Sequence, residues 1–201
     1  GLFIFYQADL LGDSQFNSVA LIFFFSAHII GVPIWVRLSQ KIGKHRCFAV
    51  NAIAFCLTTA SFYFPGEGDV ALFILLLFFT GFAHSGLQFA IRSMAADVVD
   101  YDNVQTGGQR TGLYFSLLAI TAKAGGALAI GITYPLLAFV GFDAQGGNSE
   151  EAKFAFRMIY LTIPVIAMAL AYFAIRGFSL DEAEQQILQE QIKSRNTVKT
   201  S

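Results

Sequence analysis

Long apolar runs, separated by short polar stretches, dominate the sequence. A helix needs about 20 apolar residues to cross the roughly 30 Å hydrocarbon layer of a membrane. Five runs meet this requirement, at residues 16–35, 47–64, 70–91, 112–139 and 154–175, and residues 1–7 look like the end of a sixth. The pattern predicts an all-α integral membrane protein with five complete transmembrane helices and a truncated first one.

The composition agrees with a membrane location. Hydrophobic residues make up 55% of the chain and aromatic residues 15%, which is more apolar than a soluble domain whose surface faces water. The chain opens on Gly1 within apolar sequence, without an initiator methionine or a signal-peptide pattern. We therefore expect a fragment that begins inside a helix, with residues 1–176 forming the membrane bundle.

Charged residues alternate between the connections. Lysine and arginine concentrate in every second connection, and short basic loops stay on the cytoplasmic side. The alternate connections carry mainly Asp and Glu, whereas the basic positions are Arg37, Lys41, Lys44, Arg46, Arg92, Arg110, Arg176, Lys193, Arg195 and Lys199. We expect a multi-pass protein of the cell membrane with a cytoplasmic C terminus.

Residues 177–201 form a polar tail. Ser179 and Glu182 have the spacing of a capping box ahead of apolar positions at helical intervals. This spacing predicts a short amphipathic cytoplasmic helix followed by a loose end. The helix either docks on the inner loops or on lipid, or serves only to keep the tail soluble.

Lys123 lies deep inside the fourth complete run. It follows Gly112 by eleven residues, which is about 16 Å of helix and close to the bilayer midplane. A charge there costs roughly 2.5 to 3.5 kcal/mol or more, so it should face a cavity or an anionic partner. Ser116 shares its face. We predict a substrate-binding or coupling role for both residues. The alternative is that Lys123 forms a buried ion pair with a purely structural role.

A polar stripe runs along the preceding span. His84, Gln88 and Arg92 recur every four residues and so lie on one side of a helix. Such a stripe in an apolar helix should line an aqueous path. Gln88 is the better ligand candidate because its amide both donates and accepts hydrogen bonds, as sugar hydroxyls require. His84 is either a pathway residue or a hydrogen-bonded packing residue, and for His28 we favour packing.

The link between the third and fourth complete spans contains aspartates, an arginine and a glycine pair. Asp97 and Asp100 are three residues apart and share a face that can meet Arg37, Lys41 or Arg110. One interpretation is a solvated cytoplasmic turn. The other is a cytoplasmic gate, because partly desolvated ion pairs at the mouth of a helix bundle can latch one conformation.

Motifs of several other functions are absent from the sequence. It contains no G-x-x-x-x-G-K-[ST] phosphate loop, no H-E-x-x-H, no G-x-S-x-G and no clustered metal ligands. We therefore expect a protein that is not an enzyme, with no catalytic residue, no metal site, no cofactor and no nucleic-acid partner.

Three features of the sequence carry a resemblance to a known family. They are A-D-V-V-D-Y-D at residues 96–102, T-G-G-Q-R-T-G-L-Y-F-S at residues 106–116, and Lys123. They resemble the glycoside-pentoside-hexuronide:cation symporters, the melibiose permease-like branch of the major facilitator superfamily. P-I-W-V-R-L-S-Q-K-I-G-K-H-R at residues 33–46 looks like the basic loop between the second and third helices of a major facilitator half. The resemblance covers nearly the whole chain.

This resemblance implies a fold and a function. The family has twelve helices in two halves, with substrate and ion bound between them, and this chain matches the C-terminal six-helix half, helices 7–12. Lys123 then corresponds to the family's coupling lysine of helix eleven. Asp97, Asp100, Tyr101 and Arg110 correspond to the loop between helices ten and eleven. The family's cation-binding acids belong to the N-terminal half, so Lys123 has to find its anionic partner there.

We therefore expect the C-terminal half of a secondary active transporter that couples a sugar or glycoside to Na⁺ or H⁺ by alternating access. Its partners would be the substrate, the lipid bilayer and the N-terminal six-helix half. Gln88 stands where melibiose permease has a sugar-contacting tryptophan, which argues against melibiose itself. Two rivals remain: the same fold carrying a lysophospholipid or another amphiphile, and a non-transporting membrane sensor or assembly protein.

Overall fold

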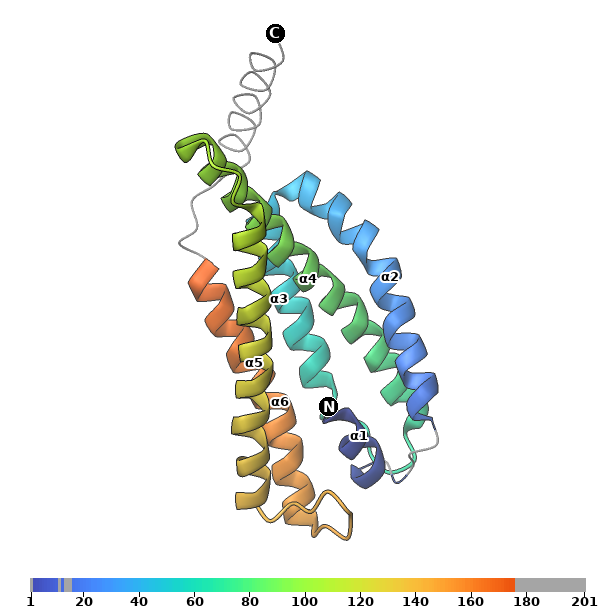
Figure 1. Ribbon diagram of the computed structural model, residues 1–201. Helices are drawn as coiled ribbons and strands as arrows, with labels where there is room; N and C mark the ends of the chain where they lie inside the picture. Colours follow the sequence, from blue (N-terminus) through green and yellow to red (C-terminus); the bar gives the residue numbers. More distant parts are fainter. Residues whose placement is uncertain (1, 11, 13–15, 176–201) are drawn as a thin grey trace.

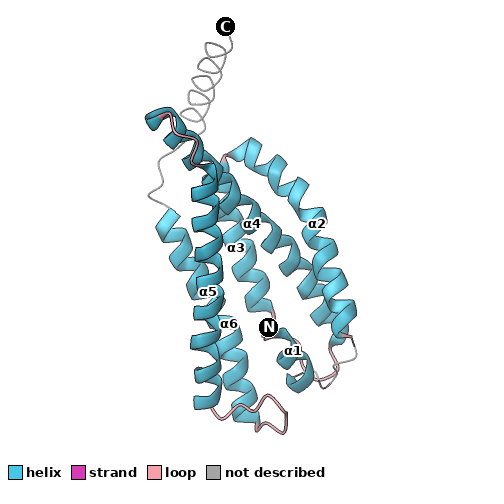
Figure 2. Ribbon diagram, in the orientation of Figure 1, coloured by secondary structure: helices cyan, strands magenta, loops and turns pink. Residues whose placement is uncertain are grey.

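The computed structural model describes residues 2–10, 12 and 16–175, and in this part of the chain every regular element is a helix. The first turns form α1 (Phe3–Phe5) and the π-helical η1 (Tyr6–Leu10). The long helices, shown in Figures 1 and 2, are α2 (Asn17–Ile42), α3 (Lys44–Ser61), α4 (Val70–Thr106), α5 (Thr111–Phe139) and α6 (Glu150–Ile175). The all-α prediction is confirmed for these residues. The amphipathic helix predicted within residues 177–201 lies outside them.

The five predicted spans each correspond to one long helix. Of the described helices, α2, α4, α5 and α6 are long and apolar enough to cross a membrane. The remaining one, α3, has 18 residues and starts with Lys44, His45 and Arg46, which lower its apolar content. Its length of about 27 Å still approaches the roughly 30 Å hydrocarbon thickness. The prediction of five complete spans therefore holds for four, and α3 is a shorter helix of the same bundle.

Helix α4 is longer than the sequence pattern predicts. The apolar run ends near residue 91, but α4 continues to Thr106, and its 37 residues make about 55 Å of helix. The sequence contains no glycine or proline between Gly86 and Gly107, so nothing breaks the helix. Gly107 ends it in the left-handed conformation, with φ 70°, and donates its N–H to the carbonyl of Asn103.

The predicted polar loop is therefore shorter than expected. Asp97, Asp100, Tyr101 and Asp102 lie on the last turns of α4, and only residues 107–110 link α4 to α5. Because α4 exceeds the hydrocarbon thickness by several turns and this end is charged, we expect it to extend past the membrane core. Figure 1 shows it beside the start of α5, at the upper end of the bundle.

The connections separate the charges at the two ends of the bundle. The α2–α3 and α4–α5 connections lie at the upper end in Figure 1, and the α3–α4 and α5–α6 connections lie at the lower end. The upper end carries basic residues such as Lys41, Lys44 and Arg110, and the lower end carries acids such as Glu67 and Asp143. This separation follows the positive-inside rule. The cytoplasmic position of the upper end stays a prediction.

Two apolar clusters hold the bundle together. The cluster towards the lower end joins η1, α4, α6 and the residue after α3 through buried aromatic rings, including Tyr6, Phe62, Phe73 and Phe156. The other joins α3, α4 and α6 through buried residues that include Phe48, Met94 and Met168. Helix α5 takes little part in this packing. Its buried residues, Thr133 and Leu137, lie near its C-terminal end, so most of α5 presents its side chains to the surroundings.

Candidate functional site

The site is built on the most extensive helix contact among the described residues, between α2 and α4. A Cβ atom on Gly81 of α4 would overlap the backbone carbonyl of Phe24 on α2, and one on Gly31 of α2 would overlap the Ser85 hydroxyl. Glycine at these positions therefore permits the two backbones to approach. This approach brings the middle of α2, with His28, against the middle of α4, with His84.

Cross-helix hydrogen bonds fix the same region of α4. The Trp35 indole N–H on α2 donates to the carbonyl of Phe82 over 2.8 Å, and the Asn51 amide on α3 donates to the carbonyl of Ala83 over 2.6 Å. The Trp35 and Asn51 side chains are both buried. In a membrane interior such polar contacts join helices that otherwise pack only through apolar surfaces. They hold α4 in a set position beside α2 and α3.

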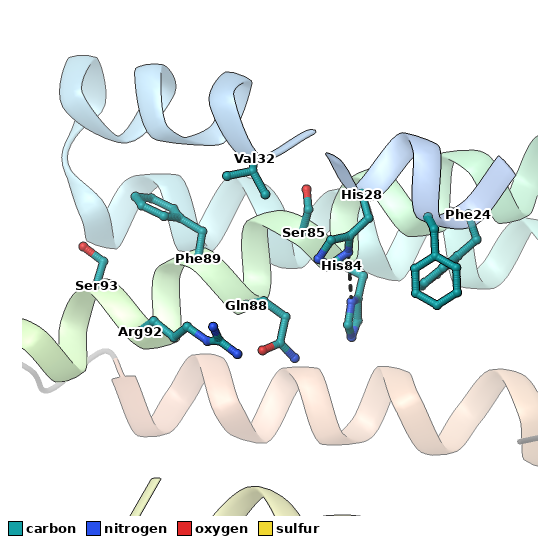
Figure 3. A pocket seen from close by; sticks show the side chains of 10 residues that line it. Phe24, His28, Val32, His84, Ser85, Gln88, Phe89, Arg92 and Ser93 are labelled. Atoms are coloured by element: carbon teal, nitrogen blue, oxygen red, sulfur yellow. Dashed lines mark hydrogen bonds between the residues drawn. The ribbon is translucent and has the colours of Figure 1, made fainter. Parts of the chain in front are cut away.

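A pocket of about 740 Å³ opens beside this contact (Figure 3). Its walls come from α2 and α4, with no described residue of another helix. The α2 wall is mainly apolar, and the α4 wall is mainly polar. The lining residues are Phe24, Phe25, His28 and Val32 of α2, and His84, Ser85, Gln88, Phe89, Arg92 and Ser93 of α4.

The predicted polar stripe lies along this pocket. His84, Gln88 and Arg92 project from one side of α4, as Figure 3 shows. Gln88 presents an amide that can bind hydroxyl groups in both directions, and Arg92 adds a permanent positive charge near the upper end. These groups can bind a polar, hydroxyl-rich ligand or an anionic one. Their functional roles stay predictions.

A second imidazole joins the stripe from α2. The Nδ1 atoms of His28 and His84 face each other at 3.5 Å, and both side chains are half-buried. The Phe24 ring flanks the pair, with centroids 6.3 Å from His28 and 5.9 Å from His84. The described residues contain no group of three or more His, Cys, Asp or Glu that could hold a metal ion. The pair is therefore better suited to hydrogen bonding than to metal binding.

The structure does not bring Lys123 and Ser116 into this pocket. Both lie on α5 and are exposed, and the Ser116 hydroxyl donates to the carbonyl of Leu113 over 2.8 Å. The small residues around Lys123 also face open space, since a Cβ atom on Gly125 or Gly126 would meet nothing within 4 Å. Within the described residues, the predicted substrate site thus consists of two separate parts, one on α4 and one on α5.

Two ion pairs lie at the upper end of the bundle, where the sequence predicts a gate. Lys44 donates to both oxygens of Asp97, and Asp97 is buried. Arg110 lies 3.3 Å from the Asp102 carboxylate. Arg37 and Lys41, named from the sequence as partners of the aspartates, are exposed on α2, as is Tyr101 on α4. The basic loop does meet the aspartate cluster, through Lys44.

Sequence reasoning assigned no site role to His28 or Lys44. His28 lies alone on an apolar helix, and Lys44 was counted only as one of several basic loop residues. A usable signal existed for His28, because His28 and His84 are the only histidines within the five apolar runs. Periodicity relates residues on one helix and cannot pair residues on two, so the contact was not predicted.

The sequence is similar to known transporters along nearly its whole length. Residues 1–182 match the family described as MFS/sugar transport protein. A glucuronide carrier protein homolog of Escherichia coli is 22% identical over 97% of this chain and 43% of its own length. An isoprimeverose transporter of Lactiplantibacillus pentosus is 31% identical over 54% of this chain and 22% of its own length.

A more distant similarity concerns a different cargo. The human sodium-dependent lysophosphatidylcholine symporter 1 is 22% identical over 92% of this chain and 35% of its own length. The chain thus spans less than half the length of each of these relatives. The family match and the apolar helices together make this a multi-pass membrane protein.

Proposed function

Because the chain belongs to the MFS/sugar transport protein family of the major facilitator superfamily, we propose that it forms the C-terminal half of a symporter. The whole transporter would move a sugar or glycoside together with Na⁺ or H⁺ by alternating access, as a carrier and not as an enzyme. The observation that carries this proposal is a polar-lined pocket between two apolar helices of a chain from this family.

The pocket supplies groups suited to a sugar. Gln88 donates to and accepts from hydroxyl groups, while His84 and Arg92 add further donors on the same side of α4. The names of two relatives refer to a glucuronide and to isoprimeverose, which are both hydroxyl-rich. We assign the sugar to this pocket, with its polar face towards α4.

Lys123 would provide the coupling between substrate and ion. Lys123 is exposed on α5, and its ammonium forms no ion pair with an acid of the described residues. A charge at this depth in a membrane requires an anionic partner. The proposed partner is an acid of the N-terminal half. Binding of the ion and the sugar replaces this ion pair, which then permits one half to rock against the other.

The upper ion pairs would close the cytoplasmic side. The Lys44–Asp97 pair joins α3 to α4, and the Arg110–Asp102 pair joins the α4–α5 link to α4. In the proposed transporter both pairs would flank the cytoplasmic mouth between the two halves. In this arrangement the C terminus is cytoplasmic, as the basic residues of the sequence predict.

Flux through the full-length protein tests the proposal. The protein is reconstituted in proteoliposomes, and uptake of para-nitrophenyl β-D-glucuronide and of isoprimeverose is measured with an inward Na⁺ gradient, an inward proton gradient or neither. We expect one gradient to drive accumulation of at least one of these sugars. Binding of a sugar without any flux would instead favour a membrane sensor or assembly protein that reuses the fold.

A second candidate cargo is a lysophospholipid or a similar amphiphile. One relative is named for lysophosphatidylcholine, and a smaller cavity of about 300 Å³ between α3, α4, α5 and α6 has mostly apolar walls, including Phe55, Phe62 and Ile163. Such walls suit an acyl chain. Equilibrium binding to the full-length protein decides between the two cargoes: binding of lysophosphatidylcholine, without binding of para-nitrophenyl β-D-glucuronide or isoprimeverose, is expected only if the amphiphile is the real substrate.

A further inference from the structure

The contact between His28 and His84 has a property that neither histidine has alone. In the neutral pair, one Nδ1 carries a hydrogen and the facing Nδ1 offers its lone pair. A proton added at the outer Nε2 of the donor ring makes that ring an imidazolium, whose Nδ1–H donates to the neutral partner. This charge-assisted bond is shorter and stronger than the neutral bond. The contact therefore gives an added proton a hydrogen bond that an isolated imidazole lacks.

A second proton is disfavoured, because it would break the hydrogen bond between the rings. It can be placed only on the remaining Nδ1, where it would point at the N–H of the facing ring across a contact of 3.5 Å. Two imidazolium ions then oppose each other and the hydrogen bond is lost. Coupled groups of this kind release their protons in steps that belong to the pair. The geometry thus sets the capacity of the pair at one added proton.

The surroundings link this proton to the contents of the pocket. Of the other lining residues only Arg92 is charged, and α2 contributes no titratable lining residue besides His28. No described residue of α3, α5 or α6 lines the pocket; on α3, the Cys47 thiol and the Asn51 amide are hydrogen-bonded to backbone carbonyls. The positive charge of Arg92 opposes a positive charge on either imidazole. A ligand that brings an acceptor oxygen or a carboxylate between Arg92 and the imidazoles removes this opposition.

We propose that His28 and His84 together form a proton-binding site, in which one proton is shared between the facing Nδ1 atoms and favours occupation of the pocket. By thermodynamic reciprocity, a ligand in the pocket raises the proton affinity of the pair by the same factor. This inference rests on the proposed transport function and deepens it, since it selects H⁺ as a coupling ion and adds a site for it on α2 and α4 beside the ion site that the family resemblance implies in the N-terminal half. No covalent step is involved; the proton enters and leaves at an outer Nε2.

The first test does not depend on transport. The full-length protein is prepared with isotope-labelled histidine, and the imidazole signals are followed by NMR between about pH 5 and about pH 8. We expect His28 and His84 to titrate together and to take up one proton between them. Two independent titrations, or two rings that stay neutral throughout, overturn the proposal.

Substitution by asparagine gives the matched variant. In His28→Asn the side-chain amide lies near the former Nδ1 and keeps a hydrogen-bonding group there, but it cannot take up a proton. We expect the titration of His84 to shift towards that of a single imidazole. His84→Asn is the second variant if the first does not fold, with the reciprocal shift of His28. The wild-type titration decides the question even if neither variant folds.

The second test concerns coupling. In proteoliposomes, an inward proton gradient should increase uptake of para-nitrophenyl β-D-glucuronide by the wild type, and this stimulation should be lost in His28→Asn. A variant that keeps the full stimulation overturns the coupling role, as does wild-type uptake that follows a Na⁺ gradient and is indifferent to protons. If the pair titrates as one site but no sugar probe is carried, the proposed transport function fails and the proton site stands.

Discussion

Lys44 donates to both carboxylate oxygens of Asp97, over 2.6 and 2.7 Å, and so joins the first turn of α3 to the extended end of α4. The Asp97 side chain is only 5% exposed, while that of Lys44 is 22% exposed. An acid buried to this extent depends on its partner, because an unpaired charge cannot recover its lost hydration. The pair therefore matters more for stability than an exposed ion pair.

Removal of the Lys44 ammonium should destabilise the protein. In Lys44→Ala the Asp97 carboxylate loses a bidentate charged donor, and we expect a loss of about 1 to 3 kcal/mol. The measurement is thermal unfolding of the full-length protein in detergent. Arg46→Ala is the matched control, because Arg46 is an exposed basic residue two positions later on α3. Equal effects of the two substitutions would contradict the structural role of the pair.

The close approach of α2 and α4 should not tolerate a side chain at Gly81. In Gly81→Ala the new Cβ overlaps the carbonyl of Phe24, and relief of this overlap requires α2 to move, at a cost of about 1 to 3 kcal/mol. Gly125→Ala on α5 is the control. It meets no atom within 4 Å, and alanine favours a helix by up to about 1 kcal/mol. Comparison of the two melting temperatures tests the prediction, which fails if Gly81→Ala is neutral.

Arg157 should anchor the turn between α3 and α4. Its two terminal nitrogens donate to the carbonyls of Tyr63 and Pro65, each over 3.1 Å, and its guanidinium lies 6.0 Å from the ring centroids of Tyr6 and Tyr63. We expect Arg157→Ala to cost about 1 to 3 kcal/mol and to speed hydrogen exchange in this turn. Arg157→Lys should be intermediate, because an ammonium lacks the planar fork.

A lysine on α6 supplies the control for Arg157. Lys153 pairs with Glu150 at the helix surface over 2.9 Å, and such pairs contribute only about 0.2 to 0.5 kcal/mol. Lys153→Ala should therefore leave hydrogen exchange in the α3–α4 turn unchanged. Faster exchange in Lys153→Ala to the same degree as in Arg157→Ala would indicate a general loosening of α6.

Lys123 should be required for coupled uptake. In the full-length protein, Lys123→Ala removes the charge proposed to pair with the N-terminal half, so gradient-driven sugar accumulation should fall by at least about ten-fold. Lys123→Arg keeps the charge and should retain part of the activity. Thr121→Ala, also exposed on α5, is the control. Unchanged accumulation and sugar affinity in Lys123→Ala would rule out the coupling role.

The helices could be predicted from the sequence, but not all of their ends. Apolar runs placed all five long helices because burial in lipid requires apolar residues in sequence. The same criterion ended the third span near residue 91, since it treats Asp97 and Asp100 as loop residues. Helix formation depends on the backbone, and no residue before Gly107 interrupts it. The aspartates therefore belong to the helix and not to a loop.

The candidate site was predicted in part. A four-residue period placed His84, Gln88 and Arg92 on one side of a helix, and they do line a common pocket. The depth of Lys123 in its apolar run also predicted a substrate role for it and for Ser116, yet α5 keeps both away from that pocket. Periodicity describes one helix at a time. The relation between α4 and α5 depends on how the helices pack.

The sequence by itself determined the elements and the charge of their ends, because span length, composition and helical period are local properties of the chain. Only the tertiary structure decided which polar groups meet. His28 pairs with His84, and Lys44 with Asp97, across 56 and 53 residues of sequence. These contacts depend on glycines that let α2 and α4 approach and on the full length of α4, which together set the distance between side chains on different helices.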